Sequence, residues 1–180
     1  MLENIRYKIN LAMMKKKYYF SNTSPYIHAA RVYDFFSQQI FQPSLYQFRE
    51  QLSKLLKDKI RIADIGAGTG LLSQQLLELQ PTAKLSVIEP SPDMNFELEY
   101  RLKDQAEHYE CTLQDCWDSL PPQDLLIFER SLFHFPNYEA PLEGLAKILY
   151  QLTNEGGTIA IYDDFEEFSI EKIKKTYAQQ

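Results

Sequence analysis

The chain has 180 residues and a mass of 21.1 kDa, the usual size of one domain. Its hydrophobic content of 44% and charged content of 24% are close to those of soluble globular proteins and exclude a collagen-like, disordered or membrane class. The formal net charge of −6 at pH 7 argues against nucleic acid as a partner, because surfaces that follow a phosphate backbone are usually basic. We therefore expect one domain, residues 1–180.

Cysteines, histidines and apolar stretches give no sign of a metal site or of export. Cys111 and Cys116 lack the spacing and partner ligands of a zinc site, and we expect reduced thiols. His28, His108 and His134 are dispersed, so no metal is expected. No apolar stretch resembles a secretory signal or is long enough to span a bilayer, which predicts a cytoplasmic protein without stable membrane insertion.

Hydrophobic periodicity and turn residues predict alternating helices and strands. Helices are expected over residues 45–56, 71–79, 92–103, 141–152 and 165–177, the first of them capped by Ser44 after Pro43. Strands are expected over residues 60–65, 84–89, 109–113, 124–129 and 158–162, with a turn at 154–157 before the last.

This alternation is typical of a parallel sheet with helices on both faces. The strand centres at residues 125–128 and 159–161 are apolar throughout, as expected for strands buried on both sides. We expect an α/β fold, a Rossmann-like doubly wound sheet of about five parallel strands. It has an N-terminal helical segment, residues 1–58, and an α/β core, residues 59–180.

The stretch A-D-I-G-A-G-T-G, residues 63–70, lies between the first predicted strand and the next helix. Glycines there allow a sharp turn and a close approach of the backbone to a ligand, and the amides at a helix start favour a negative group. The spacing G-x-G-x-G differs from the G-x-G-x-x-G of dinucleotide-binding proteins. The loop therefore predicts a ligand site, but not an NAD site.

Glu89 ends the second predicted strand, about 20 residues after the glycines. An acidic side chain at this position of a Rossmann-like fold accepts hydrogen bonds from ribose hydroxyls. The alternative is a solvated carboxylate at a strand end. Because parallel α/β sheets bind ligands at the carboxyl ends of their strands, the glycine loop and Glu89 support the same site.

Together these features resemble the class I S-adenosylmethionine-dependent methyltransferases, especially the small-molecule branch with the ubiquinone and menaquinone biosynthesis enzymes. The resemblance covers residues 59–163 and is carried by R-I-A-D-I-G-A-G-T-G at 61–70 and E-P-S-P-D-M at 89–94. It implies that the glycines make room for the methionine moiety, that Asp64 orders its amino group and that Glu89 holds the ribose. The cofactor-binding residues that it implies are Asp64, Gly66, Ala67, Gly68, Gly70, Glu89, Pro90, Met94, Asp115, Cys116, Trp117 and Arg130.

The segment L-Q-D-C-W at residues 113–117 looks like the part of this family that binds adenine. The resemblance implies that Asp115 accepts from the exocyclic amine, that the Cys116 amide meets the ring and that Trp117 stacks on it. The alternatives are that Asp115 is a turn residue and that Trp117 packs in the core.

The sequence R-S-L-F-H-F at residues 130–135 is similar to the family's loop near the transferred methyl group, so Arg130 and His134 are expected to face the acceptor. A base is needed only if the acceptor must lose a proton. His134 is the first candidate, followed by Tyr33 and Glu129, although a structural hydrogen bond explains His134 equally well. The aromatic segment around Tyr33 is a candidate lid or simply the packed face of a helix.

Two functions remain open from the sequence. The first is S-adenosylmethionine-dependent methylation of a small molecule, which releases S-adenosylhomocysteine. The second is a cofactor-binding but non-catalytic subunit with a degenerate acceptor site, because the hairpin that follows the fifth strand in typical members is not found here. We expect the edge of that strand to be covered by the last helix, by the N-terminal segment, or by another chain in a homodimer or with a partner.

Overall fold

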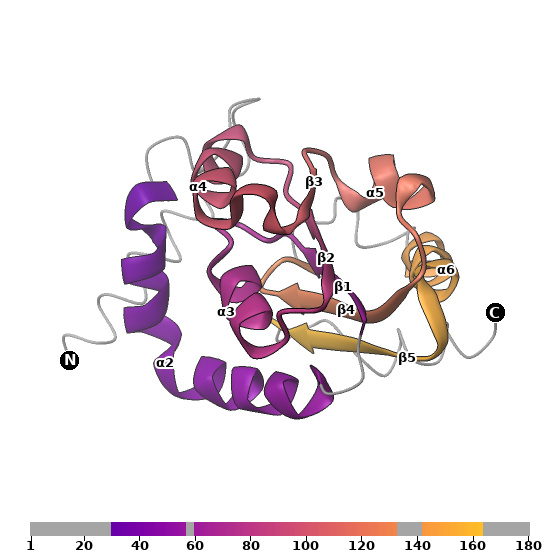
Figure 1. Ribbon diagram of the computed structural model, residues 1–180, viewed down its shortest axis with the longest axis horizontal. Helices are drawn as coiled ribbons and strands as arrows, with labels where there is room; N and C mark the ends of the chain where they lie inside the picture. The colour runs from indigo at the N-terminus through magenta and orange to yellow at the C-terminus, as the bar shows by residue number, and fades with distance from the viewer. Residues whose placement is uncertain (1–29, 57–59, 133–141, 164–180) are drawn as a thin grey trace.

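The computed structural model describes residues 30–56, 60–132 and 142–163 (Figure 1). Its strands are β1 (Arg61–Ile65), β2 (Lys84–Ile88), β3 (Glu107–Tyr109), β4 (Gln123–Glu129) and β5 (Thr153–Tyr162). Its helices are α2 (Ala30–Leu55), α3 (Leu71–Leu79), α4 (Pro92–Leu102), α5 (Leu113–Cys116) and α6 (Leu142–Leu152), with short 3-10 turns η2 (Lys103–Gln105) and η3 (Trp117–Ser119).

The five strands form one parallel sheet in the order β3-β2-β1-β4-β5. The chain moves outward from β1 to β3 and then crosses back to β4, so the direction of winding reverses between β1 and β4. In open α/β sheets this reversal opens a crevice at the carboxyl ends of the strands, where ligands bind. The predicted fold class is therefore confirmed.

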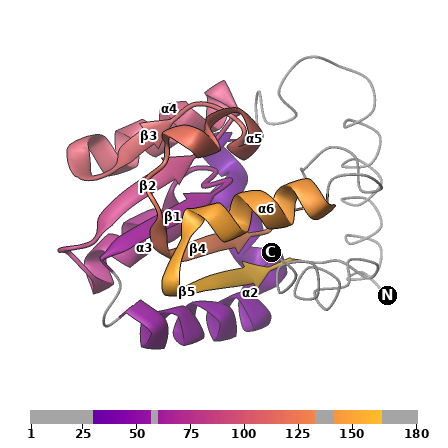
Figure 2. The same ribbon diagram turned by 90° about the vertical axis from the view of Figure 1, so that its right-hand side faces the viewer.

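Two hydrophobic layers hold helices against the faces of the sheet because successive strand residues point to opposite sides. On one face α5 and α6 pack on β1, β2 and β4 through residues such as Leu113, Leu149 and Phe128. On the other face α2, α3 and α4 cover the same strands and β5, with Leu52 and Leu98 in that cluster. Figure 2 shows α6 on one side of the sheet and α2 along β5.

The first described helix begins earlier than the sequence predicted. Instead of starting at Leu45 with Ser44 as its cap, α2 begins at Ala30 and includes Pro43. A proline inside a helix removes one backbone hydrogen bond and kinks the axis without always ending the helix. Figure 1 shows α2 bent between two limbs. The prediction treated a kink as a helix start.

The third strand is also displaced from its predicted position at residues 109–113. It covers Glu107–Tyr109 and pairs only with the end of β2, where Ile88 lies opposite Tyr109. Beyond Ile88 the chain turns toward α4, so the residues after Tyr109 have no strand to pair with. Residues from Leu113 to Cys116 then form the short helix α5.

The predicted turn at residues 154–157 is an irregular part of β5. Thr153 pairs with Gln123 and Thr158 pairs with Leu125, so the glycine-containing segment between them bulges opposite Asp124 alone. The side chain of Asp124 fixes this point. Its Oδ2 accepts the backbone amides of residues 60 and 61, each at 2.9 Å, and its Oδ1 accepts the side-chain amide of Asn154 at 2.8 Å.

The remaining predictions on secondary structure fall partly outside the described residues. Pro141, the predicted start of the helix that is observed from Leu142, lies there, as does the helix predicted at 165–177. Within the described ranges, no helix has the length and apolar character needed to cross a membrane.

We expect Asp124→Ala to lower the free energy of unfolding by about 1–3 kcal/mol, because three donors in β1, its flanking residue and β5 lose their acceptor at once. Urea unfolding measures this change. The exposed Asp118→Ala is the control and should leave stability within about 0.5 kcal/mol of the parent. Equal effects of the two substitutions would contradict the clamping role of Asp124.

Candidate functional site

The loops after β1, β2 and β4 meet at the carboxyl edge of the sheet. The loop after β1 is tied to the end of β2, because the amides of Gly66 and Ala67 both donate to the carbonyl of Ile88, at 2.7 and 3.1 Å. Behind this loop Ser131, which follows β4, donates its hydroxyl to the carbonyl of Ile65. The edge is therefore connected across three adjacent strands.

Two glycines of this loop have different surroundings although both have positive φ angles, 57° at Gly68 and 77° at Gly70. A Cβ at Gly70 would lie 2.5 Å from Cδ1 of Leu98, so the absence of a side chain lets α4 pack against the loop. A Cβ at Gly68 would meet no described atom within 4 Å. Gly68 thus presents backbone that no described side chain covers, beside the first turn of α3, where amides favour an anion.

Glu89 follows β2 and is buried, with 6% of its surface exposed. Its Oε2 accepts the amide of Gly68 and its Oε1 accepts the amide of Ser91, both at 2.8 Å. Burial raises the pKa of this carboxyl, and the two amide hydrogen bonds oppose that rise. Each oxygen keeps a second lone pair that can accept a ligand hydroxyl.

Asp64 lies on β1 directly beneath the loop and is almost fully buried. Its Oδ2 accepts the hydroxyl of Ser73 on α3 at 2.6 Å. Burial raises the pKa of Asp64 from 3.8 to about 7, and the negative charges of Glu129 and Glu89 add to the rise. A cationic ligand group near these carboxylates would favour their ionised forms.

The other residues predicted after β2 lie on α4 or just before it. Met94 is buried in α4 and Pro90 is exposed in the connection. Asn95 donates its side-chain amide to the carbonyl of Glu89 at 2.6 Å. The residues from 89 to 95 therefore hold the Glu89 backbone as well as its carboxylate.

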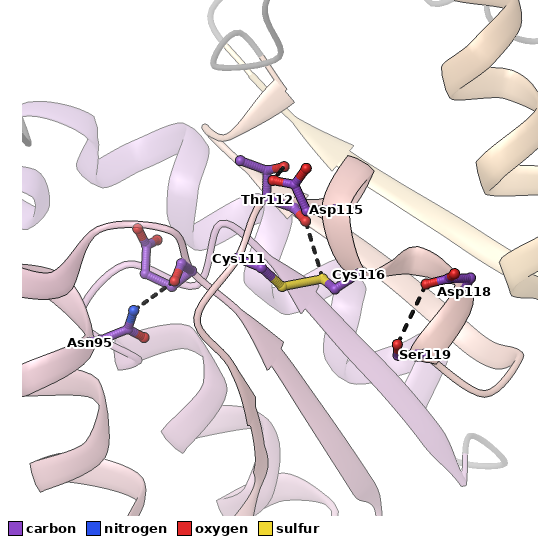
Figure 3. Close-up of a disulfide and its surroundings, with 8 residues drawn as sticks. Asn95, Cys111, Thr112, Asp115, Cys116, Asp118 and Ser119 are labelled. Atoms are coloured by element: carbon purple, nitrogen blue, oxygen red, sulfur yellow. Dashed lines mark hydrogen bonds between the residues drawn. A yellow bond between two sulfur atoms is a disulfide. The ribbon is translucent and has the colours of Figure 1, made fainter. Parts of the chain in front are cut away.

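A disulfide ties the segment predicted to bind adenine, residues 113–117, to Cys111, which corrects the expectation of reduced thiols. Cys111 and Cys116 are bonded with their Cα atoms 6.3 Å apart, and the bond closes the turn that begins α5 (Figure 3). Cys111 lies two residues before α5 and Cys116 is the last residue of α5, so this single helical turn brings the two thiols within bonding reach. The amide of Glu89 donates to the carbonyl of Tyr109 at 3.1 Å, so the segment that leads into this turn adjoins the Glu89 loop.

The surroundings of Asp115 and Trp117 are compatible with adenine binding and also with the structural roles of a turn residue and a core residue. Asp115 is exposed and accepts the hydroxyl of Thr112 at 2.5 Å, while its amide donates to the Thr112 carbonyl at 3.0 Å. These contacts are typical of a turn residue, and they leave acceptor capacity on the carboxylate. Trp117 is half-buried and packs partly against the core around Phe128.

Arg130 follows β4 with a φ of 54°, a conformation that a residue other than glycine rarely adopts. Its amide donates to the carbonyl of Tyr162 at 2.6 Å. Its guanidinium lies 5.6 Å from the ring centroid of Tyr33 and donates to the Tyr33 hydroxyl at 3.2 Å. Strained backbone of this kind clusters at functional sites.

The three candidate bases differ in what the structure says of them. Burial raises the pKa of Tyr33, so its hydroxyl keeps its proton at neutral pH and suits orientation better than proton abstraction. Glu129 is held by both oxygens, at 2.8 and 3.0 Å, by the guanidinium of Arg49. His134 lies outside the described residues.

Several residues at this edge of the sheet were not predicted from the sequence. Arg49 of α2 also donates to Gln75 of α3 at 2.9 Å, and Asp163 accepts the amide of Leu132 at 2.9 Å. Their partners are up to 80 residues away in the chain, so spacing alone carries no signal for them. Among the described residues, no cluster of three or more potential metal ligands is found.

A comparison with protein families matches residues 37–178 to the family described as methyltransferase domain. The chain belongs to this methyltransferase family. The match covers the glycine loop, Glu89 and the segment after β4, which are the parts that converge at the carboxyl edge. No curated protein sequence matches the chain.

Solved structures of similar fold include several methyltransferases. NodS, an N-methyltransferase from Bradyrhizobium japonicum WM9, is 14% identical with a TM-score of 0.63; the match covers 77% of this chain and 83% of that one. The structure of a DhpI–SAH complex is 22% identical with a TM-score of 0.57, covering 74% and 63%. The sugar N-methyltransferase KedS8 from Streptoalloteichus sp. ATCC 53650 is 19% identical with a TM-score of 0.58, covering 77% and 56%. The chain thus spans less than two thirds of DhpI and KedS8, and these likenesses describe the shared fold.

The raised pKa of Asp64 predicts a pH-dependent cost to the stability of this methyltransferase domain. Between about pH 4 and 7 the unfolded chain releases the Asp64 proton while the folded chain keeps it, so Asp64 lowers stability progressively up to its folded pKa. We expect Asp64→Asn to raise the free energy of unfolding by at least about 1 kcal/mol more at pH 8 than at pH 4.5.

Urea unfolding at the two pH values measures the effect. The exposed Asp104→Asn is the control and should change stability equally at both. An Asp64→Asn chain with the same change in stability at pH 4.5 and pH 8 would show that the Asp64 carboxyl ionises normally in the fold.

Proposed function

We propose that the chain binds S-adenosylmethionine and transfers its methyl group to a small-molecule acceptor. The observation that carries this proposal is the juxtaposition of Gly68 with Glu89 at the carboxyl ends of β1 and β2 in a methyltransferase fold. Gly68 presents backbone that no described side chain covers, and Glu89 places a buried carboxylate against the Gly68 amide. The DhpI complex contains S-adenosylhomocysteine on a similar fold, which supports the choice of cofactor.

The residues present fit the chemical parts of this cofactor. Glu89 would accept hydrogen bonds from the ribose hydroxyls with the lone pairs that its amide donors leave. The first turn of α3 would receive the methionine carboxylate, and Asp64 beneath the loop would balance the ammonium group. The disulfide-closed turn before Trp117 would border the adenine.

When bound, this cofactor supplies a methyl group on a sulfonium, which an acceptor atom can take by displacement. The protein's part is alignment and exclusion of water. Arg130 follows β4 and its guanidinium contacts Tyr33 of α2, so the guanidinium and the phenol would together orient a polar acceptor. A proton on the acceptor would go to His134 if it must leave, since Glu129 is paired and Tyr33 stays protonated.

A small acceptor suits the acidic character of the chain better than a nucleic acid does. The sugar N-methyltransferase among the similar structures supports the same class. Self-association stays a prediction: β5 forms one edge of the described sheet, and an exposed edge is a surface at which another chain can pair.

Calorimetry with S-adenosylmethionine, S-adenosylhomocysteine and NAD tests the cofactor. We expect saturable binding of the first two and none of NAD, because the loop lacks the dinucleotide spacing. Incubation of a metabolite extract with methyl-labelled cofactor then tests transfer through the appearance of a labelled product. Binding of NAD without a response to S-adenosylmethionine would refute the proposal.

The variant that tests the ribose contact is Glu89→Gln rather than Glu89→Ala, since glutamine keeps one of the two oxygens that accept the loop amides and alanine removes both. We expect Glu89→Gln to weaken S-adenosylhomocysteine binding at least about tenfold, because hydrogen bonds to a charged group contribute about 1.5–3 kcal/mol each. Glu99→Gln, exposed on α4, is the matched control. Equal affinities for the two folded variants would remove Glu89 from the binding site.

A further inference from the structure

Arg101 connects three elements beside the glycine loop. It projects from α4, and its Nε donates to the carbonyl of Thr69 at 2.8 Å while Nη1 donates to Oε1 of Gln74 on α3 at 3.3 Å. Its Nη2 forms an ion pair with Asp34 of α2. The planar guanidinium, with several donors in a fixed geometry, suits such a junction in a way that a lysine does not.

Asp34 closes the same network from α2. One carboxylate oxygen accepts the Arg101 guanidinium and the other accepts the hydroxyl of Thr69. Thr69 is buried and stands between Gly68 and Gly70. The residue between the two glycines is therefore held twice, by its carbonyl from α4 and by its hydroxyl from α2.

The neighbouring residue on α2 contacts the opposite loop. The hydroxyl of Tyr33 accepts the guanidinium of Arg130, which follows β4. Consecutive residues of α2 thus contact the loop after β1, through Asp34, and the loop after β4, through Tyr33. In the proposed function these are the cofactor loop and the acceptor loop.

We propose that Asp34 and Arg101 are positioning residues that keep α2 docked on the glycine loop and thereby slow the release of the cofactor. This inference rests on the proposed function. The side chains of the pair are 25% and 23% exposed, and the ion pair lies outside the two hydrophobic clusters that hold the helices on the sheet. Its effect is local, because loss of the pair frees α2 from α4 and leaves the Thr69 carbonyl and hydroxyl less constrained.

The test compares the wild-type chain with Asp34→Asn, Arg101→Lys and the double variant. Asparagine keeps an acceptor for Thr69 but loses the negative charge. Lysine keeps the positive charge but loses the planar guanidinium that donates to several acceptors at once. Trp117 is the only tryptophan in the sequence and borders the proposed adenine site, so its fluorescence can follow S-adenosylhomocysteine dissociation in stopped flow. Calorimetry gives the dissociation constants.

Each single variant is expected to raise the dissociation rate and the dissociation constant by about tenfold, a factor that corresponds to about 1.4 kcal/mol. The double variant should lose no more affinity than the single variant that binds the ligand more weakly, because both substitutions break the same interaction. The ligand-free variants should unfold within a few degrees of the wild type. A purely structural role would lower the unfolding temperature instead.

Glu50→Gln is the matched control, since Glu50 pairs with Lys54 on the same helix with both side chains more than two-thirds exposed. Glu50→Gln should leave the rate of S-adenosylhomocysteine dissociation unchanged. If the wild type fails to bind S-adenosylhomocysteine, the proposed function is wrong. If the wild type binds and the variants release it at the wild-type rate, or if their losses add in the double variant, the positioning role is overturned.

Discussion

The buried carboxylate of Glu89 is the interaction on which the carboxyl edge of this sheet depends. It accepts the amide of Gly68 from the loop after β1 and the amide of Ser91 at the start of α4. One side chain thereby fixes two loops that are adjacent in space and distant in sequence. The packing of α4 on Gly70, which the missing side chain of that glycine allows, joins α4 to the same loop a second time.

A site built on buried carboxyl groups lowers the stability of the folded chain in the absence of a ligand. Asp64 and Glu89 are both desolvated, which raises the pKa of each, and their charges oppose one another. A ligand with a sulfonium and an ammonium group would offset this cost. The electrostatics of the fold and the proposed cofactor are therefore consistent, and stability is given up at the positions where binding would restore it.

Local patterns predicted the architecture, whereas long-range contacts decided the details. The apolar strands, the glycine loop and Glu89 were recognisable because each signal is contained in a few consecutive residues. The short β3 and the bulge opposite Asp124 depend on how far the neighbouring strand extends and pairs. Pro43 is a local signal, but a proline can begin a helix or lie inside one, and here it lies inside α2. The Asp34–Arg101 pair bridges 67 residues, and the Cys111–Cys116 bond depends on the helical turn Leu113–Cys116, which follows the strand predicted at residues 109–113.

The most direct test of the account is an amide chemical-shift titration of the nitrogen-15-labelled chain with S-adenosylhomocysteine. We expect the largest shifts in one contiguous set, the amides of Gly66, Gly68, Glu89 and Ser91, with further shifts at Cys116. Residues at the opposite edge, such as Asp124 and Asn154, should not move. Shifts centred on that opposite edge, or none at saturating ligand, would contradict a cofactor site at the carboxyl ends of the strands.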